Sequence, residues 1–378
     1  MTPFNKNLLK KLKNDRGFAL VMVLMIVAIL TTLATEMNFA SRINAKVTAN
    51  LRDSTKAYYL AKSGINMAVQ RIRMDTLAHQ ILSQFIGSSD NLQEFWWTVP
   101  LLYPLGADMF KDLLSESGME SKNLDNFAKT QDIGGSFISE ISDESARINI
   151  NDIQFLGGTA NGPYLLLLNL VSLPKFNRFF KERARDDFVN KVVDWIDSNS
   201  EVAGLGGGIE DSDYPDYHVK NAPFFSPKEL MLVKDVGADL YAEIEPFITV
   251  FPYSVPQSTV PLGRINVNTA SREVIASLFD RSAVPDPWTI SKEIIKLRDE
   301  GTTFGSKSDF INFLKEKFEL DQEKEPRPIS RAIENVLDTR TDYFRIKSTG
   351  VVDTTTKTIT ALIDRKDRQY TTLYWRNE

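Results

Sequence analysis

Residues 17–35 read GFALVMVLMIVAILTTLAT, and this stretch decides which architectures the rest of the chain can adopt. It contains no charged residue, and a helix of this length, at about 1.5 Å per residue, approaches the roughly 30 Å hydrocarbon core of a bilayer. Residues 1–17 carry five basic side chains against one acidic side chain, a net charge of +4. Because basic flanks stay in the cytoplasm, we expect one membrane crossing, with the residues after Glu36 on the far side.

The helical pattern continues beyond the apolar run without a break. Apolar and small residues recur at spacings of three and four from Ala40 to Ile72, and no proline occurs between residues 4 and 99. This spacing is typical of an amphipathic helix. A cleaved secretory signal would have a shorter apolar region, with the cleavage site on its C-terminal side. In this chain the change from basic to apolar residues, at Arg16-Gly17-Phe18, lies on the N-terminal side of the apolar run. We therefore expect one long helix, its first half in lipid and its second half packed on a domain.

The composition limits the chemistry that is available. The chain has 378 residues, 42% of them hydrophobic and 25% charged, with no cysteine and with His79 and His218 as its two histidines. Disulfides, thiolate nucleophiles and cysteine-based zinc sites are excluded. The net charge is −5, and −9 once residues 1–17 are removed, which does not favour nucleic acid. No nucleophile–base set has a catalytic spacing, so we expect a protein that is not an enzyme.

Strand patterns flank a helical middle region. Residues 137–150 alternate apolar and polar side chains, with a turn at 143–145, and predict a β-hairpin. Residues 343–352, 358–365 and 370–376 predict three further strands of the same antiparallel sheet. Helical spacing marks five segments between these groups: 185–196, 226–233, 271–279, 289–298 and 308–317. A large helical insertion is therefore expected to interrupt a small sheet.

A repeat divides this insertion in two. Arg147-Ile148-Asn149-Ile150-Asn151 recurs as Arg264-Ile265-Asn266-Val267-Asn268, and residues 225–230 are echoed more weakly at 304–310. The proline-rich residues 246–263 predict a linker between two related units. The second copy resembles the opening of helix-hairpin-helix DNA-binding modules, but its expected hairpin after Leu278 lacks the glycine that such modules need. A retained scaffold without DNA binding is the preferred interpretation.

Residues 194–217 form the strongest polar signal outside the membrane segment. They contain seven acidic side chains and no lysine or arginine, together with four glycines. Hard cations such as Ca²⁺ prefer six to eight oxygen ligands, and converging carboxylates repel one another unless a cation joins them. The spacing is not that of an EF-hand. From the residues alone, a calcium site and a solvated acidic loop both remain open.

The N-terminal region resembles the type IV pilins and pseudopilins, which have a short basic leader ending in glycine, then phenylalanine and a long apolar helix. The resemblance implies that prepilin peptidase cuts between Gly17 and Phe18 and methylates the new amine of Phe18. Most family members carry glutamate as the fifth mature residue, but this chain has Met22 there. Within the family, that loss is a feature of the large minor pseudopilin K of type II secretion systems and marks the tip position.

The motifs around the acidic loop also resemble that K family, whose corresponding loop is associated with calcium. The family usually has Gly-Ala-Glu-Asp where this chain reads Gly208-Ile209-Glu210-Asp211. The matching order is Asp194-Trp195-Ile196-Asp197, Glu210-Asp211-x-x-Tyr214, Asn221-x-Pro223 and Ser226-x-x-Glu229-Leu230. The resemblance implies a structural Ca²⁺ with ligands drawn from Asp197, Asn199, Glu210, Asp211 and Asp213.

The implied fold is an α+β pseudopilin fold, in which a long N-terminal helix packs on a small antiparallel sheet. Two SAM-like or helix-hairpin-helix-like units form its large α-helical insertion. The corresponding regions are a leader peptide (1–17), the transmembrane and amphipathic helix (18–80), the first part of the pseudopilin domain (81–150), two insertion units (151–250 and 251–335) and the C-terminal strands (336–378). The implied location is the Gram-negative inner membrane, crossed once, with the C-terminal domain in the periplasm.

The implied function is assembly. Similar proteins join the minor pseudopilins I and J, cap the pseudopilus tip, prime addition of the major pseudopilin G and so support exoprotein export across the outer membrane. Prepilin peptidase and the inner-membrane assembly platform are further implied partners, and the insertion is expected to face an exoprotein or the secretin. Two alternatives remain: a type IV minor pilin, and a membrane-anchored, calcium-dependent periplasmic hydrolase using carboxylates of the 194–216 loop.

Overall fold

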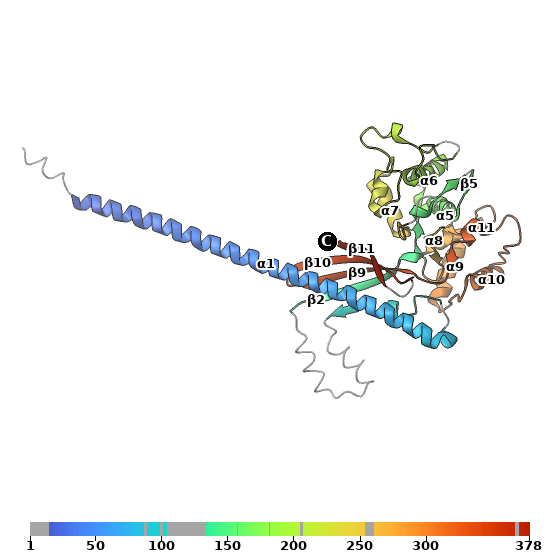
Figure 1. The fold of residues 1–378 in the computed structure, drawn as a ribbon, viewed down its shortest axis with the longest axis horizontal. Coiled ribbons are helices and arrows are strands. Elements are labelled where there is room, and N and C mark those ends of the chain that lie inside the picture. Colours follow the sequence, from blue (N-terminus) through green and yellow to red (C-terminus); the bar gives the residue numbers. More distant parts are fainter. Residues whose placement is uncertain are drawn as a thin grey trace, which may run out of the picture.

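The computed structural model describes residues 15–86, 89–98, 101–103, 134–156, 158–180, 182–204, 207–253, 261–366 and 370–378. Most of the predicted leader, residues 104–133 of the first pseudopilin part and residues 254–260 of the predicted linker lie outside the described residues. The described chain has three parts: one long helix, a five-stranded sheet on which the second half of that helix lies, and a helical insertion beside the sheet (Figure 1).

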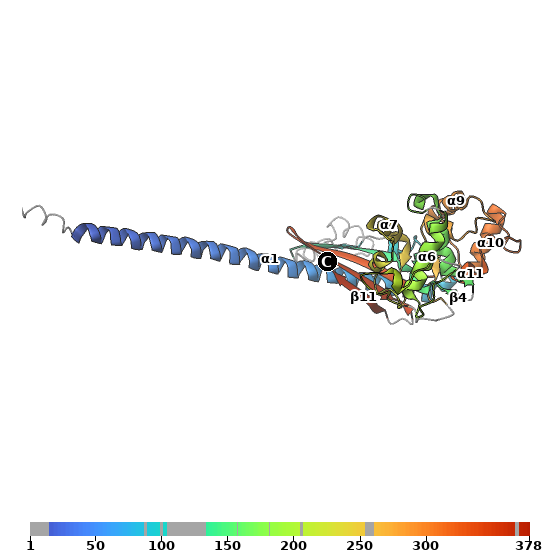
Figure 2. The same ribbon diagram turned by 90° about the horizontal axis from the view of Figure 1, so that it is seen from above.

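Helix α1 (Asp15–Ile86) is uninterrupted for 72 residues, which confirms the expected single helix. Its N-terminal half projects away from the rest of the molecule in both views (Figures 1 and 2). Its C-terminal half buries a stripe at helical spacing against the sheet: Ala57, Leu60, Ala61, Ile65, Ala68 and Ile72. The two halves of one helix therefore have opposite surroundings, although both are rich in apolar residues.

The sheet is antiparallel throughout, in the order β1-β2-β9-β10-β11. Ile346 of β9 lies opposite Ile141 of β2 and Ala361 of β10, and all three side chains face α1 in one apolar core. Leu362 points to the other face and joins the core of the insertion. The strands are β1 (Leu101–Tyr103), β2 (Ser136–Asp143), β9 (Tyr343–Val352), β10 (Thr355–Asp364) and β11 (Thr371–Asn377).

Helix and sheet approach closely where both carry glycine. A Cβ atom on Gly64 of α1 would lie 2.2 Å from the hydroxyl oxygens of Ser139 and Ser348, and one on Gly350 of β9 would lie 2.1 Å from the carbonyl oxygen of Ala57. Real Cβ atoms do not come so near to other atoms, so these positions admit only glycine without a local shift. The small residues therefore set the spacing between α1 and the sheet.

The predicted hairpin over 137–150 is wrong in its second half. Strand β2 ends at Asp143, whose side chain accepts a hydrogen bond from the Ser145 amide and opens the 3-10 turn η2 (Glu144–Ala146). Strand β3 (Ile148–Asn149) then leaves the sheet and pairs in parallel with β6 (Ile248–Thr249). The apolar alternation is real, but Ile141 belongs to the core beneath α1 and Ile148 to the core of the insertion. One alternating pattern thus spans two different cores.

The insertion contains more helices than the spacing predicted. Four predicted segments are confirmed as α6, α8, α9 and α10, while residues 226–233 contain the 3-10 helix η6 instead of an α-helix. Helices α5 and α7 were not predicted. The bounds are α5 (Gly162–Val171), α6 (Glu182–Ile196), η6 (Pro227–Leu232), α7 (Ala238–Ile244), α8 (Arg272–Ser277), α9 (Pro287–Asp299), α10 (Lys307–Phe318) and α11 (Arg331–Glu334).

Short elements complete the described chain. Beside the sheet lies the single turn α2 (Phe95–Thr98). Parallel pairing of β7 (Ile265–Asn266) with β8 (Leu337–Asp338) mirrors the pairing of β3 with β6. The remaining elements are β4 (Phe155–Leu156), β5 (Thr159–Ala160), η3 (Ile150–Asp152), η4 (Pro174–Phe176), η5 (Asp211–Asp213) and η7 (Glu245–Phe247).

The sequence repeat corresponds to one structural device used twice. The side-chain amide of Asn151 holds the backbone of Phe224: Oδ1 accepts from the Phe224 amide at 2.7 Å and Nδ2 donates to its carbonyl at 3.0 Å. Asn268 holds Phe304 in the same way, at 2.8 and 2.9 Å. Asn151 donates a third bond, to the Val250 carbonyl. We call these two contacts the asparagine clamps. They fix the start of the second half of each unit to the residues that directly follow its first strand.

Two adjacent carboxylates at the end of β2 join the sheet to the two units. Glu144 accepts hydrogen bonds from Thr249 of the first unit and from Arg345 of β9. Asp143 accepts from Thr269 and Asn266 of the second unit. Both carboxylates are buried. The sheet therefore positions each unit through its own acidic residue.

Candidate functional site

The first half of α1 is an exposed apolar surface. The helix is long and apolar enough to cross a membrane, and its most apolar window is entirely unburied. Phe18 is 68% exposed and Leu51 is 64% exposed. Exposed apolar patches of this size mark contact with lipid or with other proteins. This half of α1 has the properties of a surface that is buried elsewhere, in a bilayer or against other helices.

The predicted processing residues lie at the start of this surface. Gly17 and Phe18 are within α1, and Met22, one helical turn further on, is 53% exposed. An unpaired carboxylate at the Met22 position would cost a few kcal/mol in lipid, so the thioether suits a helix without a neighbour to neutralise it. Cleavage after Gly17 and the tip role of Met22 stay predictions.

The acidic loop begins where α6 ends, and it gathers three carboxylates. Asp194 is fully buried, with Oδ1 accepting from the Ala203 amide at 2.7 Å. Its Oδ2 has no hydrogen-bond partner, and neither has Oδ1 of Asp197 or Oε1 of Glu210, although all three atoms are buried. Unpartnered buried carboxylate oxygens are costly, and each can accept a cation.

The electrostatics of these three groups agree with the geometry. Burial, together with the charges of Asp197 and Glu210, raises the pKa of Asp194 to about 7. Burial also raises the pKa of Asp197, to about 6. The pKa of Glu210 is raised by burial and by the charges of Asp197 and Asp211. The protein thus holds negative charge together without a cationic side chain to balance it.

The other predicted ligands have different partners. Asn199 Oδ1 accepts from the Glu201 amide at 2.7 Å. Asp211 accepts from the Val219 amide at 2.8 Å and contacts His218 Nδ1 at 3.2 Å, while Asp213 forms an ion pair with Lys234 at 3.7 Å. The structure therefore brings Asp197 and Glu210 together with Asp194, which was not among the predicted ligands. Asp194 is the better placed residue because its free oxygen is completely buried.

The backbone of the loop passes directly over these carboxylates. A Cβ atom on Gly208 would lie 2.1 Å from Asp194 Oδ2, so only glycine lets the chain come this close. A Ca²⁺ site requires six to eight oxygen ligands, to which carboxylates contribute. Asp194, Asp197 and Glu210 are thus the side chains with oxygens free for a cation, but their ligand atoms do not form a metal-sized group in this structure, so calcium binding stays a prediction.

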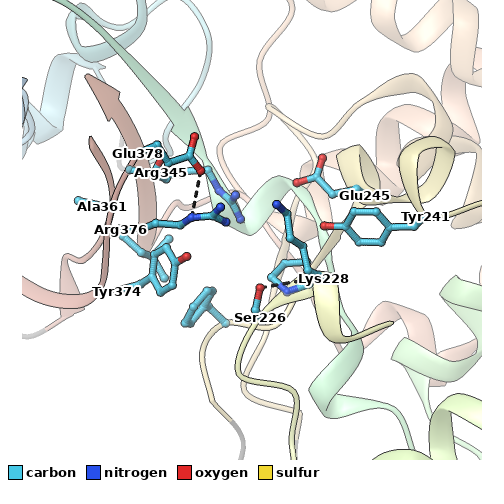
Figure 3. Close-up of a pocket in the computed structure, with 13 residues that line it drawn as sticks. Ser226, Lys228, Tyr241, Glu245, Arg345, Ala361, Tyr374, Arg376 and Glu378 are labelled. Carbon is cyan, nitrogen blue, oxygen red and sulfur yellow. Dashed lines mark hydrogen bonds and ion pairs between the residues drawn. The ribbon is translucent and has the colours of Figure 1, made fainter. Parts of the chain in front are cut away.

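A separate cavity of about 200 Å³ lies on the seam between the sheet and the first unit. Arg345, Arg376 and Glu378 line it from the sheet side, and Lys228, Tyr241 and Glu245 line it from the insertion (Figure 3). Arg376 Nε and Glu378 Oε1 form an ion pair at 3.0 Å. Ser226 accepts from the amide of Lys228, and the described lining contains no histidine. None of the residues that line this cavity belongs to the 194–216 loop, on which the hydrolase alternative depends.

Two family models match the chain. The model described as "Type II secretion system (T2SS), protein K" matches residues 146–253, which contain the first asparagine clamp and the acidic loop. The model described as "PilX N-terminal" matches residues 16–66, the exposed half of α1 and the start of its packed half. The two matches therefore fall on the two candidate functional regions.

Curated relatives cover most of the chain. A type II secretion system protein K of Pseudomonas aeruginosa is 25% identical over 311 residues, which is 80% of this chain and 78% of the relative. One from Aeromonas hydrophila is 20% identical over 374 residues, 94% of this chain and 95% of the relative. A solved structure, the GspK-GspI-GspJ complex of enterotoxigenic Escherichia coli, matches with a TM-score of 0.60 and 17% identity, covering 88% of this chain and 99% of that chain. This likeness confirms the pseudopilin fold with its helical insertion.

Proposed function

We propose that this chain, a minor pseudopilin of the protein K family of type II secretion systems, caps the periplasmic pseudopilus together with minor pseudopilins I and J. The observation that carries this proposal is the division of α1. One half is bare and apolar, and the other is fixed to a head that the insertion makes broad (Figure 1). A subunit of this shape presents a helix for bundling and a head too wide for lateral packing in a narrow shaft.

The proposal gives each region a task. The leader orients insertion with its C-terminal domain in the periplasm, and removal of the leader by prepilin peptidase frees Phe18. The exposed half of α1 then leaves the inner membrane and packs against the helices of I and J, on the assembly platform. The resulting cap primes addition of the major pseudopilin G. The head of the cap faces the exoprotein or the secretin, and no step requires this chain to act as an enzyme.

Calcium has a structural task in this proposal. Asp194, Asp197 and Glu210 would hold the ion, which would neutralise their charge and fix the acidic loop over the end of α6. The solved complex of the Escherichia coli relative contains its I and J partners, which supports the proposed partnership for this chain. The broad head argues against an ordinary pilin.

Co-purification of the full chain with its I and J homologues from detergent-solubilised membranes tests the proposal. We expect Leu51→Asp to reduce recovery of I and J at least tenfold, because a charge would then lie in the helix bundle. Phe225→Asp is the matched control: it is 65% exposed against 64% for Leu51, but it lies on the insertion. Equal recovery with both variants, or no recovery with the unmodified chain, would overturn the proposal.

A further inference from the structure

A second polar cluster lies at the opposite end of α1 from the membrane segment. Asp75 and His79, one turn apart on α1, meet Asp90 and Glu94 of the segment that precedes and enters α2. One ligand atom from each of the four residues lies within 4.8 Å of the others, and this is the only such group among the described residues. Asp75, Asp90 and Glu94 are 5%, 2% and 8% exposed. The cluster is therefore inside the protein.

The imidazole of His79 is held in the tautomer that binds metals. Its Nδ1 lies 3.1 Å from the backbone carbonyl oxygen of Asp75, and a carbonyl can only accept, so Nδ1 carries the proton. Nε2 is then a bare lone pair, buried and without a hydrogen-bond partner. It faces Glu94 Oε1 at 3.5 Å. Two acceptors that face each other in a buried site need a proton or a cation between them.

One carboxylate of the cluster already has a cation. Asp90 forms a two-pronged ion pair with Arg365, with bonds of 2.8 and 2.5 Å. Asp75 Oδ2 has no hydrogen-bond partner and is buried. Glu94 is fixed by the amide of Asn91 at 3.0 Å and by the indole of Trp96 at 2.6 Å. A buried carboxylate oxygen of Asp75 and a buried imidazole nitrogen of His79, both without a hydrogen-bond partner, therefore lie in one cluster with Glu94.

The electrostatic consequence is visible in both carboxylates. Burial and the charge of Asp90 raise the pKa of Asp75 to about 6, even though His79 opposes the shift. Burial and the charges of Asp90 and Asp75 raise the pKa of Glu94 to about 8. In the geometry of the cluster, Asp75 Oδ2 lies 3.5 Å from His79 Nδ1 and Glu94 Oε1 lies 3.5 Å from His79 Nε2.

We propose that Asp75, His79 and Glu94 bind a divalent transition-metal ion of the Zn²⁺ class. An imidazole nitrogen with two carboxylate oxygens is a ligand set that suits zinc and its neighbours, whereas Ca²⁺ would require six to eight oxygens. The i,i+4 spacing of Asp75 and His79 places both on one helix face, which is the sequence signal for the site. Asp90 is a positioning residue, because Arg365 and the Thr341 amide occupy its oxygens.

The ion would join three parts of the molecule. Asp75 and His79 belong to α1, Glu94 precedes α2, and the Asp90 amide donates to the Thr339 carbonyl just beyond the second unit. Binding would therefore fasten the far end of α1 to the junction of sheet and insertion. It would stabilise the head without involving the acidic loop, which lies in the first unit and is built from oxygen ligands alone.

Metal binding by the full chain in detergent tests this assignment. After chelation, and with Ca²⁺ in excess to fill the acidic loop, we expect one equivalent of Zn²⁺ to bind and Co²⁺ to give the absorption bands of a low-coordinate site. His79→Gln is expected to weaken Zn²⁺ binding at least tenfold. His218→Gln is the matched control, since His218 is the other histidine of the chain and is exposed beside Asp211.

X-ray absorption at the zinc edge of the unmodified chain keeps the proposal testable even if a variant folds poorly. We expect one imidazole nitrogen and oxygen ligands at about 2.0–2.2 Å. Absence of bound zinc, a shell without imidazole, or equal loss of Zn²⁺ binding in the His79 and His218 variants would overturn it. Glu210→Gln is expected to abolish the calcium response and to leave Zn²⁺ binding unchanged. Each of the two metal assignments can therefore be contradicted without affecting the other.

Discussion

The two units of the insertion share a framework and differ in one loop. Each begins with a short strand carrying the Asn-x-Asn repeat, closes with a parallel strand partner and uses an asparagine clamp on a phenylalanine backbone. Between the second helix and the clamped phenylalanine, the first unit has residues 197–223, whereas the second has only residues 300–303. The second unit folds without the long acidic loop, so the loop is an addition to the framework and not a requirement of it.

The units also differ in how they are attached to the sheet. Glu144 binds the first unit and has Arg345 as counter-charge, whereas Asp143 binds the second unit through neutral hydroxyl and amide groups. Burial alone would raise the pKa of Glu144, but the hydrogen bonds and charge of Arg345 outweigh it and lower the pKa. Burial raises the pKa of Asp143 to about 7. The junction with the first unit therefore needs an ionised Glu144, whereas the junction with the second unit favours a protonated Asp143.

Removal of the asparagine clamps is expected to have the largest effect on the free energy of unfolding. Asn151→Ala leaves the Phe224 amide, the Phe224 carbonyl and the Val250 carbonyl without partners, at about 1–3 kcal/mol each, so we expect a loss of about 4–6 kcal/mol in the free energy of unfolding. Asn268→Ala leaves only the two groups of Phe304 and should cost less. Urea titration of both variants measures the difference, with the exposed Asn177→Ala as control. A larger loss of unfolding free energy in Asn268→Ala than in Asn151→Ala would contradict this comparison of the two clamps.

The pH dependence of the two junctions is the next largest effect. Asp143 has a raised pKa in the folded state, so its contribution to stability is present at acid pH and is lost as the pH rises from about 4 to about 7, on the order of 4 kcal/mol. Glu144 behaves oppositely: its lowered pKa gives stability above its unfolded value that is lost in acid. Unfolding measured from pH 4 to 8 should show a smaller decline in Asp143→Asn. An unchanged slope in that variant would contradict the assignment.

Calcium is expected to stabilise only the first unit. At a free concentration a hundredfold above the dissociation constant, a bound ion adds about 2.7 kcal/mol, so the melting temperature should rise by about 5 °C relative to EGTA. Glu210→Gln should abolish the rise because it removes a ligand charge. Glu300→Gln, in the corresponding connection of the second unit, is the control and should retain it. A rise that survives Glu210→Gln would place the ion elsewhere.

Substitution of two glycines is expected to have the smallest effect on stability and gives the most closely matched pair of variants. Gly207 in the acidic loop and Gly301 in the short connection have φ angles of 98° and 102°. A Cβ on Gly301 would meet nothing within 4 Å, so Gly301→Ala should cost only the backbone strain, about 1–2 kcal/mol. A Cβ on Gly207 would lie 1.9 Å from Asp187 Oδ1, so Gly207→Ala should cost more. The difference in thermal stability between the Gly207→Ala and Gly301→Ala variants measures the contribution of packing around Gly207.

The sequence predicted those features that periodicity controls. The continuity of α1, the C-terminal strands and four insertion helices follow from spacings of two, three and four residues, although α1 is longer, at 72 residues, than the roughly fifty that the spacing indicated. The sequence repeat also marks the two asparagine clamps that the structure shows. The hairpin prediction failed because residues 137–150 face two cores in succession, and periodicity does not identify which core a residue meets. Residues 226–233 adopt a 3-10 helix after Pro227, a distinction that apolar spacing does not make.

The polar sites depend on contacts between residues far apart in sequence, so less of their geometry could be predicted. The acidic composition indicated the loop, but the unpartnered oxygens of Asp194, Asp197 and Glu210 emerge only when α6 and the loop fold together. Asp211 and Asp213 have partners at His218 and Lys234 that no spacing indicated. His79 contacts Glu94 across 15 residues of sequence, a contact that no spacing indicated. Calcium binding and its ligands remain predictions.

The central claim is that this minor pseudopilin occupies the end of the pseudopilus, because its head is too broad for the shaft. Electron microscopy of pseudopili sheared from cells, with a gold label on the insertion, tests this most directly. The account predicts label at one end of each fibre and nowhere else. Label distributed along the fibres would contradict it.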